Sequence, residues 1–259
     1  MSNYIKSEFY RILRRRGTYM FIGVCSLLLV SANVVLALVK LSAPDFGYAT
    51  TNFSLANLYS SMAAAFLLCV WVASMIFGNA YNNHTFKNSI SYGISRGTLY
   101  FGKLIVQIVY ALAAFIVISG LYILSAYLLL ENSGPAALEM LFKTLFACLP
   151  FLIFALVTAN CFNFILESTG ASITATLMVL LAFPLVSEFL GMKFVFFEKL
   201  AKLLPWNLIG AIRIDTEKNI LHFYWNTQLD YGFCWLTGIV QVVLFALIGY
   251  MIYRRKEIK

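Results

Sequence analysis

Charged residues are scarce in this sequence. Only 12% of the 259 residues are charged, whereas about 25% are charged in an ordinary soluble domain. Hydrophobic residues make up 61% of the chain. Such a chain has too few polar groups to cover a water-exposed surface, which excludes a soluble fold. The composition predicts one integral membrane domain over residues 1–259.

The sequence also lacks the motifs and residue clusters of familiar catalytic and metal sites. It contains neither a complete GxxxxGK[S/T] phosphate loop nor an HExxH metal motif. The five cysteines lie in apolar stretches, with no CxxC pair and no neighbouring histidine. We therefore expect this chain to have no catalytic residues, no bound cofactor and no metal site.

Ionisable side chains are missing from the centres of the long apolar runs. Lys40, Glu167, Glu188 and Asp230 fall near the ends of these runs, and the centres hold only neutral polar groups such as Asn33. Ion-driven transporters and proton pumps usually keep charged groups near the middle of the membrane. If the protein transports anything, its energy source is expected in another polypeptide.

What the sequence does contain is six long apolar runs. A helix needs about 20 apolar residues to cross the roughly 30 Å hydrocarbon layer, and all six runs meet this requirement. We predict an all-α membrane protein with six transmembrane helices. The expected spans are residues 19–41, 58–79, 104–130, 140–166, 171–191 and 229–253.

The basic residues between the spans predict the orientation. Five Lys and Arg residues lie in the N-terminal segment, three lie in the loop 79–103, and four lie at the C-terminal end. Positive charge near span ends tends to stay in the cytoplasm, so both termini are expected there and Asp45, Glu131 and Lys199 outside. The net charge of +8 is therefore a topology signal, and we predict no nucleic-acid partner.

The N-terminal segment 1–18 is predicted to be a cytoplasmic amphipathic helix in the membrane interface. Ile5, Phe9, Ile12 and Leu13 recur at helical spacing, while basic residues project elsewhere. Two roles remain open for it, anchoring by positive charge and contact with a partner.

The segment 192–228, predicted to be external, is long enough to require structure of its own. Apolar residues at helical spacing are interrupted by a proline, which predicts a helical hairpin before the last span. Its helices either dip into the outer leaflet or lie flat on the membrane. Candidates for an external gate are Phe197, Leu204, Pro205 and Trp206.

The cytoplasmic loop 79–103 contains a short predicted helix at residues 85–92. Phe86 and Ile90 would lie on one side of it, with Lys87, Asn88 and Ser91 on the other, and Gly93 would end it. A mostly polar loop with a few apolar anchors suits contact with a soluble partner.

This loop resembles the permeases of type-2 ABC transporters. Three segments carry the resemblance: Thr85-Phe86-Lys87-Asn88, Ser91-Tyr92-Gly93-Ile94-Ser95-Arg96 and Tyr100-Phe101-Gly102-Lys103. The architecture of six spans, an N-terminal interfacial helix and an external helical insertion is similar as well.

The resemblance implies that the loop is a coupling helix seated in a cleft of a separate ATP-binding subunit, which would hold ATP and Mg. Phe86 would be an apolar anchor in that cleft. The implied contact residues are Thr85, Phe86, Lys87, Asn88, Ile90, Tyr92, Ser95 and Arg96.

The resemblance further implies a pair of permease chains, either identical or sister chains, in a bacterial plasma membrane. In the family the first and fifth spans line the interface between permeases. The small residues that begin the fifth span are therefore interface candidates, because they let helices approach closely in lipid. These candidates are Gly170, Ala171, Thr174 and Ala175.

The expected function is export of amphipathic peptides, such as toxins or antimicrobial peptides, or of other hydrophobic molecules. Two alternatives stay open. One is a secondary transporter or channel that works alone, against which the lack of central ionisable residues counts. The other is a membrane scaffold or immunity protein that transports nothing.

Overall fold

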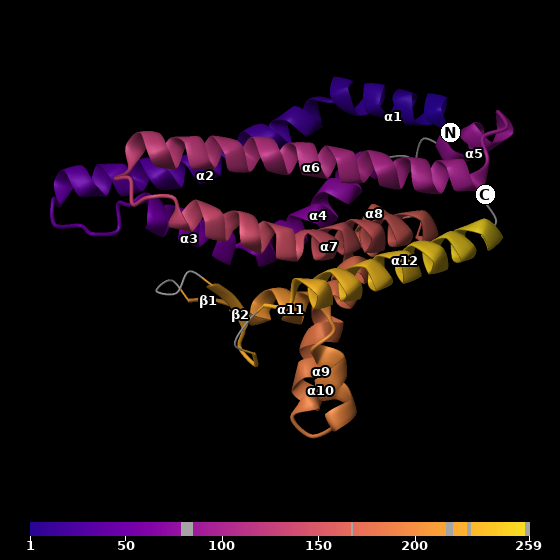
Figure 1. Cartoon of the computed structure of the whole chain (residues 1–259). Helices are drawn as coiled ribbons and strands as arrows, with labels where there is room; N and C mark the ends of the chain where they lie inside the picture. The colour runs from indigo at the N-terminus through magenta and orange to yellow at the C-terminus, as the bar shows by residue number, and fades with distance from the viewer. Residues whose placement is uncertain (79–84, 167, 216–219, 227–228, 257–259) are drawn as a thin grey trace.

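The computed structural model describes residues 1–78, 85–166, 168–215, 220–226 and 229–256. Long helices lie side by side in a bundle (Figure 1). The start of α1 (Ser2–Arg14), the short helix α5 (Thr85–Ser91) and the end of α12 (Tyr231–Arg255) lie together at one end of it. We call this the α5 end of the bundle.

Among the described residues, five helical segments are long and apolar enough to cross a membrane, or six if one bent pair counts as a single span. They match the predicted runs in position. Four are α2 (Arg16–Ser42), α6 (Arg96–Leu129), α7 (Ala136–Ile165) and α12. The fifth runs over Thr169–Gly191. The chain is thus a multi-pass membrane protein.

The second predicted span is broken in the structure. It consists of α3 (Thr51–Ser60) and α4 (Met62–Phe77), which meet at an angle of 53°. Ser61 lies at the break, and its hydroxyl donates to the carbonyl of Leu58 at 2.8 Å. Such a bond from a serine to the preceding turn competes with the helix backbone and bends helices.

The fifth span changes its winding halfway along. It begins as α8 (Thr169–Leu177), passes through a π turn, η1 (Met178–Ala182), and continues as α9 (Phe183–Gly191). Pro184 explains the π turn, because proline has no N–H and its ring clashes with the carbonyl four residues earlier in an α-helix.

Helix α7 forms the core of the bundle. In the most apolar stretch of 18 residues of α7, 67% of the residues are buried, whereas 11–28% are buried in the corresponding stretches of the other four spans. Helix α12 packs closely along it. A Cβ at Gly238 would lie less than 3.0 Å from Pro150 of α7, and one at Gly249 would meet Cys161 of α7 and Tyr100 of α6 as closely. The other helices keep exposed apolar faces for lipid or a partner chain.

Helix α1 is shorter than the predicted segment 1–18, and one of its faces differs from the prediction. Ile12 is buried, as expected for its apolar side, but Leu13 is 61% exposed. Glu8 is buried instead, with its side chain 6% exposed. The helix therefore turns an acidic residue toward the bundle.

The segment 192–228 contains the two short helices that the pattern predicts, and it also contains two strands that the pattern does not predict. Helices α10 (Val195–Ala201) and α11 (Pro205–Ala211) are followed by two antiparallel strands, β1 (Ile212–Asp215) and β2 (Ile220–Phe223). Helices α9 and α10 form a hairpin that projects from the bundle, beside α11 (Figure 1).

Candidate functional site

Helix α5 lies at one end of the bundle, as the loop pattern predicts. Gly93 ends it with a φ of +82°, and Ile94 donates its N–H to Ser89 at 3.1 Å. Tyr92 follows the last residue of the helix and is 88% exposed. Residues 79–84 of the predicted loop lie outside the described residues. Also exposed on this helix are Lys87, Asn88 and Ser91.

Phe86 does not point outward. Its side chain is 3% exposed, and its ring centre lies 5.1 Å from that of Phe164 in α7 and 5.9 Å from that of Phe77 in α4. The expectation that Phe86 inserts into a partner's cleft is therefore wrong for this structure. The residue holds α5 to the bundle instead.

Phe164 is the centre of an aromatic cluster that we call the junction. Its ring centre lies 4.8 Å from that of Phe77, 5.1 Å from that of Tyr100 and 4.5 Å from that of Tyr253. With Phe86, these residues bring together α4, α5, α6, α7 and α12. A displacement of α5 would therefore press on four helices of the bundle.

A buried lysine adds α1 to the junction. Lys103 of α6 has a fully buried side chain, and its Nζ lies 3.3 Å from Glu8 Oε2. The ammonium also lies over the rings of Phe77 and Phe86, at 4.9 and 5.6 Å from their centres. Burial raises the pKa of Tyr4, and the neighbouring Glu8 carboxylate raises it further.

Two basic side chains cap the C-terminal ends of α12 and α7 near this junction. Arg96 donates from Nη1 to the carbonyls of Arg254 and Lys256, at 2.7 and 2.6 Å, at the C-terminal end of α12. Lys256 donates to Ile165 at the end of α7, at 3.0 Å. Positive charge at these ends satisfies free carbonyls and complements the helix dipoles.

Two motif-like spacings in this region prove to be structural. Gly93 to Gly97 reads GISRG, yet Ser95 is the N-cap of α6 and accepts from the N–H of Thr98 at 3.2 Å. Gly97 to Lys103 has GxxxxGK spacing, yet it lies within α6 and is followed by leucine. Neither a nucleophile elbow nor a phosphate loop is formed.

Sequence reasoning did not identify Glu8, Lys103, Phe164 or Tyr253 as site residues. One signal was available, because Glu8 is the only acidic residue in an otherwise basic N-terminal segment. The partner of Glu8 lies 95 positions away and could not be read from a pattern.

The predicted interface residues lie on one face of α8. Gly170, Ala171 and Thr174 are exposed and Ala175 is half-buried, whereas Ser172 and Thr176 face the bundle.

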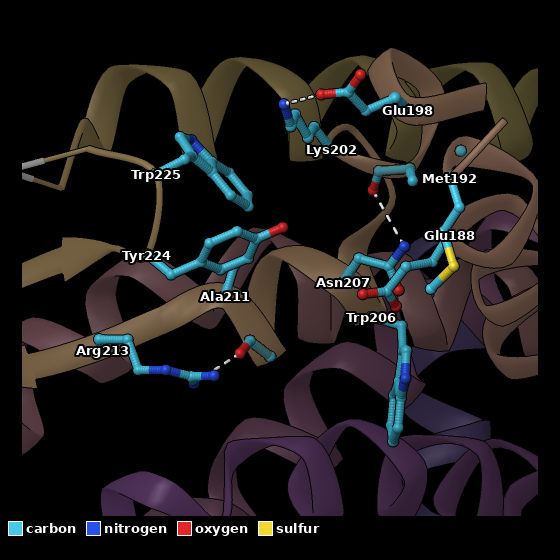
Figure 2. Close-up of a pocket in the computed structure, with 13 residues that line it drawn as sticks. Glu188, Met192, Glu198, Lys202, Trp206, Asn207, Ala211, Arg213, Tyr224 and Trp225 are labelled. Atoms are coloured by element: carbon cyan, nitrogen blue, oxygen red, sulfur yellow. Dashed lines mark hydrogen bonds and ion pairs between the residues drawn. The ribbon is translucent and has the colours of Figure 1, made fainter. Parts of the chain in front are cut away.

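Three of the four predicted gate residues are consecutive at the start of α11, and the fourth lies in α10. Phe197 lies in α10, half-buried among phenylalanines, and Leu204 and the buried Pro205 start α11. Trp206 packs on Phe66 of α4. Of the four, only Trp206 lines a cavity of about 470 Å³ between α9, α10, α11 and the β-hairpin (Figure 2).

A family model described as "ABC-2 family transporter protein" matches residues 4–187, from α1 into α9. No curated protein matches the chain.

Proposed function

Because the chain belongs to the ABC-2 family of transporter proteins, we propose that it is the membrane permease of an exporter driven by a separate ATP-binding subunit. In this role it has six spans, with α3 and α4 as one bent span and both termini in the cytoplasm of a bacterial cell. The chain supplies the pathway, and ATP and Mg bind on the partner.

The observation that carries this proposal is the packing of α5. Its outer surface, with Lys87, Asn88 and Tyr92, is free to meet a soluble subunit, while Phe86 ties it to the junction. Movement of an ATPase on binding nucleotide would displace α5. The displacement would be transmitted to α7 through the contact of Phe86 with Phe164, and to α1 through Lys103 and Glu8.

The remaining predicted contact residues are proposed in modified roles. Ile90 and Arg96 are half-buried and lie on the bundle side of the loop. Ser95 caps α6. Thr85 begins α5. We assign direct contact with the ATPase to Lys87, Asn88 and Tyr92.

A second permease chain completes the pathway in this proposal. The exposed face of α8 that carries Gly170, Ala171 and Thr174 is suited to close helix contact in lipid. The exposed apolar residues of α2 offer a second contact surface. The partner is either an identical chain or a sister permease.

The proposed cargo is an amphipathic peptide or another hydrophobic molecule moved outward. The spans offer apolar faces, and the described helices contain no carboxylate at mid-membrane to bind a small cation. The energy for transport then has to come from ATP hydrolysis on another chain.

The test is reconstitution of the chain in liposomes with and without a candidate ATP-binding subunit that co-purifies with it. ATP-dependent movement of a dye-labelled amphipathic peptide is expected only when both chains are present. Tyr92→Ala should reduce transport and co-purification of the ATPase, whereas Tyr48→Ala, at an aromatic residue 59% exposed in the α2–α3 loop, should not. Transport by this chain alone would contradict the proposal and favour a self-sufficient transporter.

A further inference from the structure

The cavity beside the β-hairpin has no role in the coupling described above. Its wall is built by α9, α10, α11, β1 and the turn after β2. Every lining residue lies between Glu188 and Trp225, after the end of the family match at residue 187. Membership of the family therefore says nothing about this pocket. Its volume of about 470 Å³ lies within the range of pockets that bind small molecules or short peptide segments.

Glu188 is the carboxylate of this pocket that remains available. Glu198 is paired with Lys202 at 2.7 Å, a contact that lowers the pKa of Glu198 and raises that of Lys202. Arg213 donates to the carbonyl of Gly210 at 2.8 Å. Glu188 has no hydrogen bond or ion pair with any described residue.

Asn207 holds the wall of the pocket in place. It donates from Nδ2 to the carbonyls of Pro184 and Ala201, at 3.3 and 3.2 Å. These two bonds fix the amide between α9 and α10, and its Oδ1 is closed to solvent. Glu188 is therefore the acceptor that a ligand in the pocket can reach.

Aromatic rings complete the lining. Tyr224 and Trp225 face the pocket, and the Lys202 ammonium already lies 6.0 Å from the ring centre of Trp225. Aromatic faces attract cations, and a carboxylate accepts the N–H groups of an ammonium. Figure 2 shows Glu188 and Asn207 on one side of the pocket and Arg213 on the other.

We infer that this pocket binds a lysine-bearing segment of an amphipathic peptide, with the ammonium at Glu188. The inference rests on the proposed function, because it takes the peptide to be the cargo. A peptide is favoured over a single lipid headgroup because the unpaired carboxylate and the arginine lie on opposite sides of the pocket, which suits an extended ligand.

The test uses the full chain alone, in nanodiscs of phosphatidylcholine, without any ATPase. The probe is a dye-labelled peptide of leucine and lysine, and its matched partner has every lysine acetylated, which removes the charge. Fluorescence anisotropy should show about fivefold tighter binding of the lysine peptide, the size of effect expected for one partly exposed ion pair. Raising the salt concentration should shrink the difference, because exposed charges are screened.

Variants of the pocket locate the effect. Glu188→Gln should bring the two peptides to equal affinity, and Glu188→Lys should weaken the lysine peptide further. Asp45→Asn removes an exposed carboxylate outside the pocket and should change nothing. Thermal unfolding of each variant confirms that it is folded. Preference for the lysine peptide that survives Glu188→Gln would overturn the inference.

Lipid is tested as the other source of an ammonium group. Adding phosphatidylethanolamine to the nanodiscs should leave peptide binding unchanged. If it abolished binding, the pocket would take lipid headgroups and the peptide assignment would be wrong. Because no ATPase is present, failure here leaves the proposed exporter function to its own transport test.

Discussion

Lys103 and Glu8 form a buried ion pair that joins α6 to α1, with Lys103 Nζ 3.3 Å from Glu8 Oε2. Arg11 lies 2.5 Å from the same carboxylate oxygen, on the more exposed side. This ion pair gives the N-terminal helix a structural role in addition to that of an interfacial anchor. Through Glu8, α1 is bound to the same lysine that lies over the ring of Phe86.

Removing the charge of Glu8 should destabilise the protein. Glu8→Gln leaves the Lys103 ammonium buried without a counter-charge, which costs about 3–5 kcal/mol when a buried pair is broken. Thermal unfolding of the purified protein should show this loss. The double variant Glu8→Gln with Lys103→Met should recover most of it, because no charge then remains buried.

A matched control is the exposed pair of Glu139 and Lys143, which lie 2.7 Å apart in α7. Glu139→Gln should cost less than about 1 kcal/mol, since surface pairs contribute little. Equal losses of stability in Glu8→Gln and Glu139→Gln would show that the buried pair contributes no more to stability than the exposed pair.

Phe86→Ala should lower the stability of the permease itself. Truncating a buried phenylalanine costs about 3–5 kcal/mol because a cavity is left behind. Limited proteolysis of the isolated chain should then cut near α5 faster than in the wild type. Tyr92→Ala should leave proteolysis unchanged, because that ring is exposed. Unchanged proteolysis in both variants would mean that Phe86 does not hold α5.

Gly249→Ala should disturb the contact between α12 and the bundle. The new methyl group would lie less than 3.0 Å from Tyr100 Oη and from Cys161 Sγ. Gly120→Ala is the control, since nothing lies within 4 Å of a Cβ there. Alanine in an exposed helix interior should even stabilise α6 by up to about 1 kcal/mol. A lower melting temperature for Gly120→Ala than for Gly249→Ala would contradict the close packing.

Labelling of single cysteines tests the orientation. In a cysteine-free background, Lys199→Cys should react with an impermeant thiol reagent in intact cells, because α10 is expected outside. Lys87→Cys, on α5, should react only after the cells are opened. Both lysines are exposed, so access to reagent differs only by the side of the membrane. Labelling of Lys87→Cys in intact cells would reverse the proposed topology.

The positions of the long helices could be predicted because apolar length alone decides whether a helix can span lipid. The end of α5 was also predictable, since Gly93 takes a positive φ that favours glycine. The burial of Phe86 was not predictable. Helical spacing shows that Phe86 and Ile90 share a face, but it does not show whether that face meets the same chain or another.

Two other misses have local causes. The alternation of apolar and polar residues in Ile212–Asp215 is the period of a strand, and the prediction read only the helical spacing before it. The bend between α3 and α4 depends on how the Ser61 hydroxyl is used, which a hydropathy profile does not register.

The π turn Met178–Ala182 places one extra residue in the fifth span. Because one residue of an α-helix corresponds to about 100° of rotation, the faces of α9 are offset by about that angle from those of an unbroken α-helix. Pro184 opposes α-helical winding at this point, so the offset is built into the span. The offset therefore sets the direction in which Glu188 projects relative to the exposed face of α8.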